Sequence, residues 1–434
     1  MKRITLGQHA RPLSVLFLAG LLGVSGAQGE SLEQAWELGI AANHQLRSSK
    51  ELVVAAEHQV AAAEGARLPS IEFGASATAL DAAPQIQAPF GPVQGGFEFM
   101  ESSFYRYRTA ANLPVFTGGR ITNVIGAAQA RYGAARAQSE TAVQELKLAI
   151  AKAYVDVLRA GQAVRVARRA VKSLSRHLLD ADNRHQQGLV ARTHVLSGQA
   201  ALASARQGEI AASNALVVAR AAYNRITGRE IAAAVEVEEL SPPPRPPVSY
   251  AELVDAARSS RPEIRALEEQ EHALRRQARA AFGESLPQVS ISGGYDHIEN
   301  RNLVNEGIWS VSLGLNWSLY DGNTSRNKRD GLVRQAESVY EQRLELDSII
   351  ELQVKQAWLS VHEALRRIAV AADGVSHAEE NLRMTSNRYR EGLASNTEVL
   401  DAERQLTESQ ADRANAVYDA VLSDLSLNYA VGGL

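Results

Sequence analysis

Two long stretches of the chain carry the same apolar pattern, which limits the possible folds more than any other feature. Apolar residues recur at alternating steps of three and four, with large and small side chains interleaved. The first seam comprises Leu146, Ile150, Ala153, Val157, Ala160, Val164, Ala167, Val171, Leu174 and Leu178, and the second comprises Ile350, Val354, Ala357, Val361, Ala364, Ile368, Ala371, Val375, Ala378 and Leu382. This spacing predicts two helices that pack in coiled coils.

The predicted helices are unusually long. The pattern around the first seam extends from about Arg120 to Gln187, which corresponds to roughly 100 Å at about 1.5 Å per residue. A compact domain needs no element of this length. An ordinary helical bundle usually explains a single heptad run, but two matched runs favour an elongated coiled-coil structure.

Both seams belong to a duplication that covers most of the chain. NRHQQGLVARTHVL, starting at Asn183, and NRYREGLASNTEVL, starting at Asn387, share seven of their fourteen residues at an offset of 204. Upstream, Leu68 corresponds to Leu286 at an offset of 218. The difference falls in APQIQAPFGPVQGG, which predicts a longer loop in the first half. Each half predicts a helix, a β-hairpin, a long helix, a Gly-Leu turn and a second helix.

The duplication gives the expected domain organisation. We divide the chain into a signal peptide (1–29), a first structural repeat (30–228), a Pro-rich linker (229–248) and a second structural repeat (249–434). The signal peptide is indicated by basic residues followed by a short apolar run and small residues, MKRITLGQHARPLSVLFLAGLLGVSGAQG. No later stretch is apolar for long enough to span a bilayer as a helix. A mature chain that enters a membrane must therefore do so with strands.

Four stretches alternate between apolar and polar residues. The alternation is clearest in IWSVSLGLNWSLY, where Trp309, Val311, Leu313, Leu315, Trp317 and Leu319 share one face. Weaker alternation begins at Ser70, Phe104 and Gln288. About 9–11 residues suit a tilted membrane strand, and a small, polar second face suits a water-filled lumen. The alternative, a soluble β-sandwich, lacks a second sheet in this chain.

Four strands per chain leave two open sheet edges, whose unpaired backbone groups cost several kcal/mol each in hydrocarbon. The sheet must therefore close with copies of itself. Two chains would give an eight-stranded barrel filled by its own side chains, whereas three chains give twelve strands and room for a conduit. We therefore predict a trimer of a mixed α and β membrane protein, in which a 12-stranded transmembrane β-barrel is continued by an α-helical coiled-coil barrel.

Composition excludes several classes of function. The chain has no cysteine, so disulfides and thiolate chemistry are excluded. Its formal net charge of −3 and scattered basic residues give no reason to expect a nucleic-acid partner. The sequence contains no nucleophile elbow, phosphate loop or zinc-protease helix, so we expect no enzyme and no cofactor. His177, His185 and His194 are spaced by eight and nine residues, which does not fit metal ligation.

The chain has a duplicated plan, with NLPVFTGGR and NWSLYDGN before the long helices and paired Gly-Leu turns, the second followed by TEVLDAERQL. In these features it resembles the TolC-like outer-membrane efflux protein family. The resemblance covers essentially the whole mature chain. It implies a homotrimeric passive duct in the outer membrane of a Gram-negative bacterium, in contact with lipid, whose helical barrel crosses the periplasm. It also implies two partners, a periplasmic adaptor and an inner-membrane pump that is either an ABC transporter or proton-driven. The cargo is a small molecule or a polypeptide.

Two alternatives come from other classes of protein. A periplasmic adaptor also carries a long coiled-coil hairpin, but only one hairpin among small β domains. A structural periplasmic coiled coil is the other alternative. Neither accounts for two matched hairpins together with amphipathic strands.

The repeated Gly-Leu pairs mark the two turns between long helices. Gly188 and Gly392 suit the position just past a helix end, where a positive φ is favourable only for glycine. Leu189 and Leu393 would then be exposed. The resemblance implies that they are adaptor-docking residues at the periplasmic mouth. Alternatively, each Gly-Leu pair only forms a helix C-cap with a hydrophobic contact.

Two acidic residues follow the second turn. Glu398 and Asp401 are three positions apart and share one helix face, so three chains would supply six carboxylates that favour cations. The resemblance implies that these residues line the pore entrance. For Glu398 there is an equal alternative, because Ser395 and Glu398 have the spacing of a capping box.

The remaining gate residues differ from the family pattern. The resemblance implies that Tyr389 holds the mouth closed with a first-turn partner next to Thr193. That partner is acidic in the family and is His194 here. Ala394 replaces a typical basic residue. One hypothesis is that His194 makes closure pH-sensitive; the alternative is a solvated surface histidine.

Overall fold

The computed structural model describes residues 29–87, 96–242 and 249–434. The first half contains α1 (Leu32–Ala42), α2 (His44–Gly65), β1 (Ser70–Ala79), β2 (Gln85–Gln87), β3 (Gly96–Glu98), β4 (Ser103–Phe116), α3 (Arg120–Gln186) and α4 (Arg192–Ile226). The second half contains α5 (Tyr250–Ser260), α6 (Pro262–Gly283), β5 (Gln288–Glu299), β6 (Gly307–Asn316), α7 (Thr324–Arg390) and α8 (Asn396–Val431). All of the predicted signal peptide except Gly29 lies outside the described residues, as does the end of the Pro-rich linker.

The two halves repeat one another element by element. Helices α3 and α7 each have 67 residues and start 204 positions apart, at Arg120 and Thr324. Helices α1 and α2 correspond to α5 and α6 at the second offset, 218. Every residue of the two predicted apolar seams is buried or half-buried, so the heptad pattern identified the packed face of both long helices.

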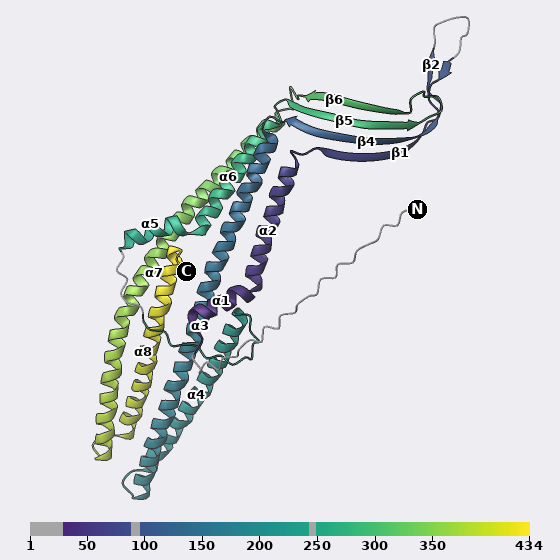
Figure 1. Cartoon of the computed structure of the whole chain (residues 1–434). Coiled ribbons are helices and arrows are strands. Elements are labelled where there is room, and N and C mark those ends of the chain that lie inside the picture. Colours follow the sequence, from purple (N-terminus) through teal and green to yellow (C-terminus); the bar gives the residue numbers. More distant parts are fainter. Residues whose placement is uncertain (1–28, 88–95, 243–248) are drawn as a thin grey trace, which may run out of the picture.

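The helices form an elongated body with an arched sheet at one end (Figure 1). Near the sheet, α3 contacts α2 and α6, and α6 contacts α7. Farther from the sheet, α4 contacts α3, α3 contacts α8 and α8 contacts α7. Two coil pairs, α3–α4 and α7–α8, therefore lie beside each other, and their tips are at the end opposite the sheet (Figure 1). No helix in the described part of the chain is both long and apolar enough to cross a membrane.

The four long strands form one antiparallel sheet in the order β1-β4-β5-β6. Its register pairs Phe73 with Thr109, Thr109 with Tyr295, and Tyr295 with Trp309. Paired residues in a sheet point to the same side. The alternating patterns of all four strands are therefore in phase. Apolar residues lie on one face of the sheet, and polar and small residues lie on the other.

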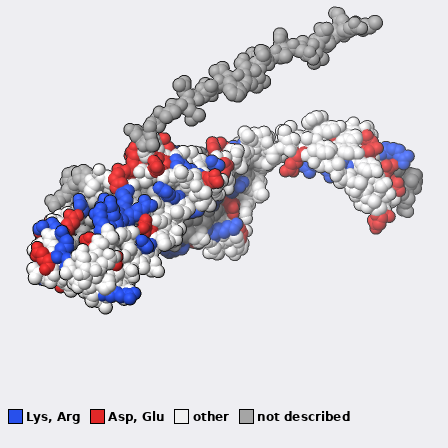
Figure 2. Space-filling model, turned by 90° about the horizontal axis from the view of Figure 1, so that it is seen from below, with Lys and Arg blue, Asp and Glu red and all other residues white. Residues whose placement is uncertain are grey.

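One face of the sheet is apolar and exposed in the single chain. It presents Ile71, Phe73, Tyr105, Tyr107, Leu113, Ile291, Tyr295, Trp309, Val311, Leu313 and Leu315. On the opposite face, Arg106 forms an ion pair with Asp296, and the hydroxyls of Ser292 and Ser312 are 2.7 Å apart. Charged residues are sparse on the arched sheet in Figure 2 and gather at its far end, whereas both signs are mixed over the helical body.

One expectation about the strands was wrong, and another was incomplete. Strand β6 ends at Asn316, so Trp317 and Leu319 do not continue it. The Trp317 indole instead donates to the Ser285 carbonyl oxygen at 3.2 Å, as the chain turns toward α7. The connection is longer in the first half, as predicted, and residues 88–95 of it lie outside the described residues. Residues 85–87 pair with residues 96–98 in a short two-stranded ribbon, which satisfies backbone groups near the far end of the sheet (Figure 1).

The main core lies midway along the helical body. Tyr154 of α3 is fully buried, and its single hydroxyl hydrogen is shared between the carbonyl oxygens of Glu30 (2.7 Å) and Glu238 (2.9 Å). Asn224 of α4 donates its side-chain amide to the Ile231 and Ala233 carbonyl oxygens. The described part of the predicted linker is therefore held against α3 and α4 rather than free of them.

Ile150 tests the importance of this core. Its side chain is fully buried, so Ile150→Ala should lower the free energy of unfolding by about 2–5 kcal/mol through lost burial and the remaining cavity. The measurement is the thermal unfolding midpoint in detergent. Ile231→Ala is the matched control, because the Ile231 side chain is 62% exposed. Equal midpoints for the two variants would contradict the assignment of this core.

Candidate functional site at the helical tips

The tip of the first coil pair ends α3 with a Schellman motif. Gly188 has a φ of 76°, in the left-handed region. The Leu189 amide donates to the Arg184 carbonyl oxygen and the Gly188 amide to the His185 carbonyl oxygen, both at 2.9 Å. These two bonds satisfy carbonyl groups that the helix end would otherwise leave unpaired.

The tip of the second coil pair repeats this geometry. Gly392 has a φ of 79°. The Leu393 amide donates to the Arg388 carbonyl oxygen at 2.8 Å, and the Gly392 amide donates to the Tyr389 carbonyl oxygen at 3.0 Å. The predicted glycine caps are thus present at both tips.

The leucines at the tips are not buried by these caps. Leu189 is 62% exposed and Leu393 is 64% exposed. In a Schellman motif this residue often packs on the residue five positions earlier, which is an arginine at both tips, Arg184 and Arg388. The capping interpretation therefore accounts for the glycines and leaves the leucines free to contact another molecule.

Glu398 completes the capping box that the sequence allowed. The Ser395 amide donates to the Glu398 carboxylate at 2.9 Å, and the Glu398 amide donates to the Ser395 hydroxyl at 3.2 Å. These hydrogen bonds lower the pKa of Glu398 below its ordinary value. An Arg388 nitrogen also lies 3.9 Å from the carboxylate. Glu398 is therefore an ionised cap that still lies on an exposed face.

Asp401 lies one turn farther along α8 and is exposed. The sequence reasoning missed its neighbour Arg404, whose guanidinium lies 3.6 Å from the Asp401 carboxylate and 3.1 Å from that of Glu408. The i,i+3 and i,i+4 spacings were visible in the sequence. The acidic face of α8 therefore includes a cation within one turn of Asp401.

Tyr389 and His194 are brought together between the two tips. Tyr389 is only 3% exposed, and its hydroxyl is 3.3 Å from His194 Nδ1. Thr193 remains exposed. Burial raises the pKa of the Tyr389 hydroxyl. His194 is half-buried, so its ring is a contact between the coil pairs and not a fully solvated histidine.

Arg184 adds a second link between the tips. Its guanidinium donates to the Arg390 carbonyl oxygen at 2.6 Å and lies 5.3 Å from the centre of the Tyr389 ring. Ala394, at the position where the family pattern has a basic residue, offers no such group. The first tip of the same chain thus supplies a cation against Tyr389.

A buried polar network joins α3, α4 and α8 just inside the tips. His177 Nε2 donates to the Asn396 side-chain oxygen at 2.7 Å, and the Asn396 side-chain nitrogen donates to the Ser197 hydroxyl at 2.7 Å. Asn396 is 4% exposed. One residue at the start of α8 thereby holds both helices of the first coil pair.

Glu403 extends this network and was also missed. It is 7% exposed and accepts a hydrogen bond from the Ser173 hydroxyl of α3. Continuing the heptad steps along α8 from Val399 would have identified it, since Val399, Glu403 and Leu406 follow the steps of four and three.

The three histidines near the first tip have separate roles. His185 Nδ1 contacts the Val190 carbonyl oxygen at 3.0 Å, whereas His177 contacts Asn396 and His194 contacts Tyr389. No group of three metal-ligating side chains occurs among residues 29–87, 96–242 and 249–434.

Comparison with known proteins places this geometry among outer-membrane channels. Outer membrane protein TolC of Vibrio cholerae is 25% identical over 98% of this chain and 96% of its own length. Alkaline protease secretion protein AprF of Pseudomonas aeruginosa is 24% identical over 71% of this chain and 65% of its own length. The crystal structure of the outer membrane protein VceC of Vibrio cholerae superposes with a TM-score of 0.79 at 19% identity, covering 93% of this chain and 96% of that one.

The family model for the outer membrane efflux protein matches residues 37–229 and 253–433. The match includes one 67-residue helix and one tip from each half of the duplication. The protein is accordingly located in the outer membrane of a Gram-negative bacterium and acts as a passive export channel rather than an enzyme. The chain belongs to the outer membrane efflux protein family.

Proposed function

We propose that three copies of this chain form a continuous duct, a 12-stranded barrel in the outer membrane followed by a helical barrel in the periplasm. The observation that carries the proposal is that the single chain has open edges in both its sheet and its row of helices. A closed ring of identical chains satisfies both kinds of edge with the same symmetry.

Among the described residues the sheet edges are β1 and β6, each with one side unpaired. Both carry large apolar side chains on the same face, such as Phe73 at 71% exposed and Val311 at 83% exposed. Lipid is the environment that suits this face, but lipid offers no hydrogen bonds to an open edge. Pairing β1 of one chain with β6 of the next removes every edge. Three chains leave space for a hydrated lumen, whereas two do not.

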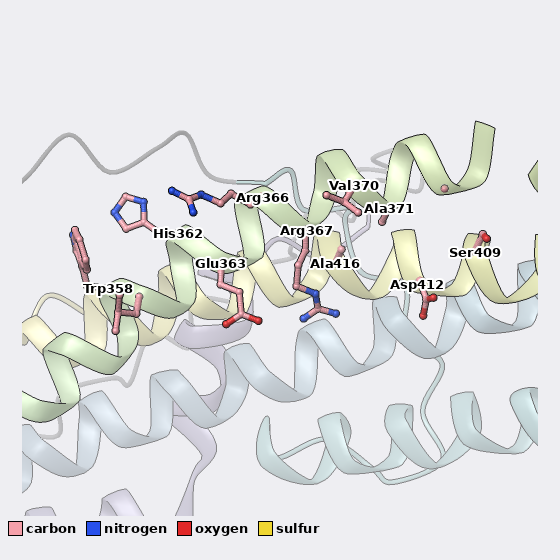
Figure 3. A pocket seen from close by; sticks show the side chains of 12 residues that line it. Trp358, His362, Glu363, Arg366, Arg367, Val370, Ala371, Ser409, Asp412 and Ala416 are labelled. Atoms are coloured by element: carbon pink, nitrogen blue, oxygen red, sulfur yellow. The ribbon is translucent and has the colours of Figure 1, made fainter. Parts of the chain in front are cut away.

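The long helices pack in the order α4, α3, α8, α7, so α4 and α7 lie at the two edges and each has an open side among the described residues. Helix α4 carries an exposed heptad of Leu196, Ala203, Ile210 and Val217. Helices α7 and α8 form a groove of about 1030 Å³ whose lining includes Leu359. Val370, Ala371 and Ala416 also line it (Figure 3). In the trimer, α4 of one chain occupies this groove of the next. Arg366, Glu363 and Asp412 along the groove supply both signs of charge at its rim (Figure 3).

The tips form the entrance of this duct, and Glu398 and Asp401 line it. Leu189 and Leu393 are then exposed at the periplasmic end, six per trimer, where a periplasmic adaptor docks. An inner-membrane pump, an ABC transporter or a proton-driven one, supplies the energy. AprF is an alkaline protease secretion protein, which supports polypeptide cargo, whereas membership of the efflux protein family supports small-molecule cargo. The match to both halves favours the duct over the adaptor and structural coiled-coil alternatives.

The assembly is tested by a charge placed in the proposed groove contact. Ile210→Glu should reduce the trimer fraction to near zero, because a buried unpaired carboxylate costs several kcal/mol. The measurement is the mass of the detergent-solubilised protein by light scattering. Ile231→Glu, at an almost equal exposed fraction, should remain trimeric. A wild-type protein that is a stable monomer or dimer would end the proposal.

Docking is tested at the exposed leucines. The double variant Leu189→Ser, Leu393→Ser should reduce export in cells by roughly tenfold or more, since losing apolar anchors at an interface costs at least about 1–2 kcal/mol. Its conductance in planar bilayers should equal that of the wild type. Leu179→Ser is the control, because Leu179 is 61% exposed but lies on α3 away from the turn. Normal export by the double variant would remove the docking role.

Ion selectivity tests the charges at the entrance. Glu398→Gln with Asp401→Asn should lower the cation-to-anion permeability ratio by roughly two- to fivefold, and Arg404→Gln should raise it by a similar factor. The opposite signs follow from removing negative or positive charge. Reversal potentials in a salt gradient provide the measurement. If Arg404→Gln leaves the ratio unchanged, the charged face of α8 does not line the lumen.

A further inference from the structure

A carboxyl group is buried between the two coil pairs near the entrance. Glu403 of α8 accepts a hydrogen bond from the Ser173 hydroxyl of α3, and His177 of α3 is near enough to influence its pKa. Its exposed fraction of 7% contrasts with the exposed Asp401 and Arg404 on the other side of the same helix. An ionised carboxylate at such a position is costly unless a charged group compensates it.

The charges that could compensate Glu403 are few. His177 of α3 is near enough to lower the pKa of Glu403 electrostatically, but its Nε2–H donates to Asn396. The next titratable groups belong to the contacts of His177: the Tyr389 ring of α7 is 5.2 Å from the His177 ring, and its hydroxyl contacts His194 of α4. On α7, Arg383 is paired with Glu380. No fixed cation pairs with Glu403 in the described part of the chain.

Glu403 lies where separation of the coil pairs would expose it. The same stretch of α8 holds Asn396, which contacts His177 of α3 and Ser197 of α4. Moving α8 away from α3 breaks these bonds together with the bond from Ser173 to Glu403. It also brings water to the Glu403 carboxyl group, which can then ionise without the cost of burial.

We propose that protonation of Glu403 stabilises the packed arrangement of the two coil pairs and that its ionisation favours their separation, so that opening of the entrance depends on pH. This inference deepens the duct function proposed above and rests on it. Glu403 is distinct from the exposed acidic residues Glu398 and Asp401, and it takes no part in the His194–Tyr389 contact.

The direction of the pH dependence follows from burial. Burial raises the pKa of Glu403 in the packed arrangement, while the hydrated side chain has its ordinary value. The packed arrangement therefore binds the proton more tightly. It is most stable at low pH and loses this stability as the pH rises through the raised pKa. Between the two pKa values, the ratio of separated to packed coil pairs increases up to about tenfold per pH unit for each chain.

The test combines conductance with a measurement that needs no pore. Conductance of the full-length protein is recorded in planar bilayers from pH 4 to 8. In parallel, spin labels are attached at Gln187→Cys and Glu391→Cys, one on each tip, and their separation is measured over the same pH range. The natural chain has no cysteine, so these positions are the only ones labelled. We expect both conductance and label separation to increase with pH.

Glu403→Gln has almost the same shape as the natural side chain but cannot ionise. It should stay packed, with low conductance and a label separation that no longer changes with pH. Glu380→Gln is the control, because Glu380 is an exposed carboxylate of α7 paired with Arg383, and this variant should keep the wild-type profile. A wild-type profile in Glu403→Gln, or no pH dependence in the wild type, would overturn the inference.

Ser173→Ala gives a second test that keeps the carboxyl group. The Ser173 hydroxyl stabilises the ionised form, so its loss should move the transition to higher pH by roughly half a unit to one unit. A shift of the transition to lower pH, or no shift, would contradict the proposed role of Glu403. If no variant and no wild-type protein conducts, the duct function is wrong, and the label separations still decide whether Glu403 controls packing.

Discussion

Every backbone amide and carbonyl group in a membrane must find a hydrogen-bond partner, and this requirement connects most features of the protein. In the part of the chain that the structure describes, the sheet has four long strands, with its edges at β1 and β6. Its apolar face suits lipid, but its edges do not, because lipid cannot form hydrogen bonds with their unpaired backbone groups. The proposed closure with further copies meets the requirement, and it also gives the exposed heptad on α4 a partner in the groove between α7 and α8.

The helical end of the molecule meets a different requirement. The coil pairs must hold together but also separate if cargo is to pass between them. Their seams are apolar along most of α3 and α7. Arg159 of α3 pairs with Asp419 of α8 midway along the body, and further polar contacts lie near the tips, around Tyr389, Asn396 and Glu403. Polar contacts are easier to exchange for water than apolar packing, because water can replace each hydrogen bond. Their position next to the turns suits a part of the molecule that opens.

Much of the fold was predictable because its periodicities are local and occur twice. The steps of three and four defined the seams of α3 and α7, and the alternation from Trp309 to Leu315 defined β6. The paired Gly-Leu turns predicted both tips. The end of β6 was missed because Trp317 continues the alternating pattern. Its indole instead donates to the carbonyl oxygen of Ser285, and no local pattern reveals a contact between residues so far apart in the sequence. The ribbon of β2 and β3 was missed for a similar reason, since its pairing depends on where the adjoining strands end.

The sequence by itself determined the element types, the duplication and the apolar faces, because these depend on residue spacing along one helix or strand. Only the tertiary structure decided which polar groups meet at the tips. Glu398 and Asp401 stood out in sequence, but the structure added Arg404 beside Asp401 and put Glu403, two residues from Asp401, between α3 and α8. A helix turns about 100° per residue, so neighbours in sequence face opposite environments. Which face of α8 is buried depends on how the first coil pair packs against it, and the sequence of α8 alone does not show this.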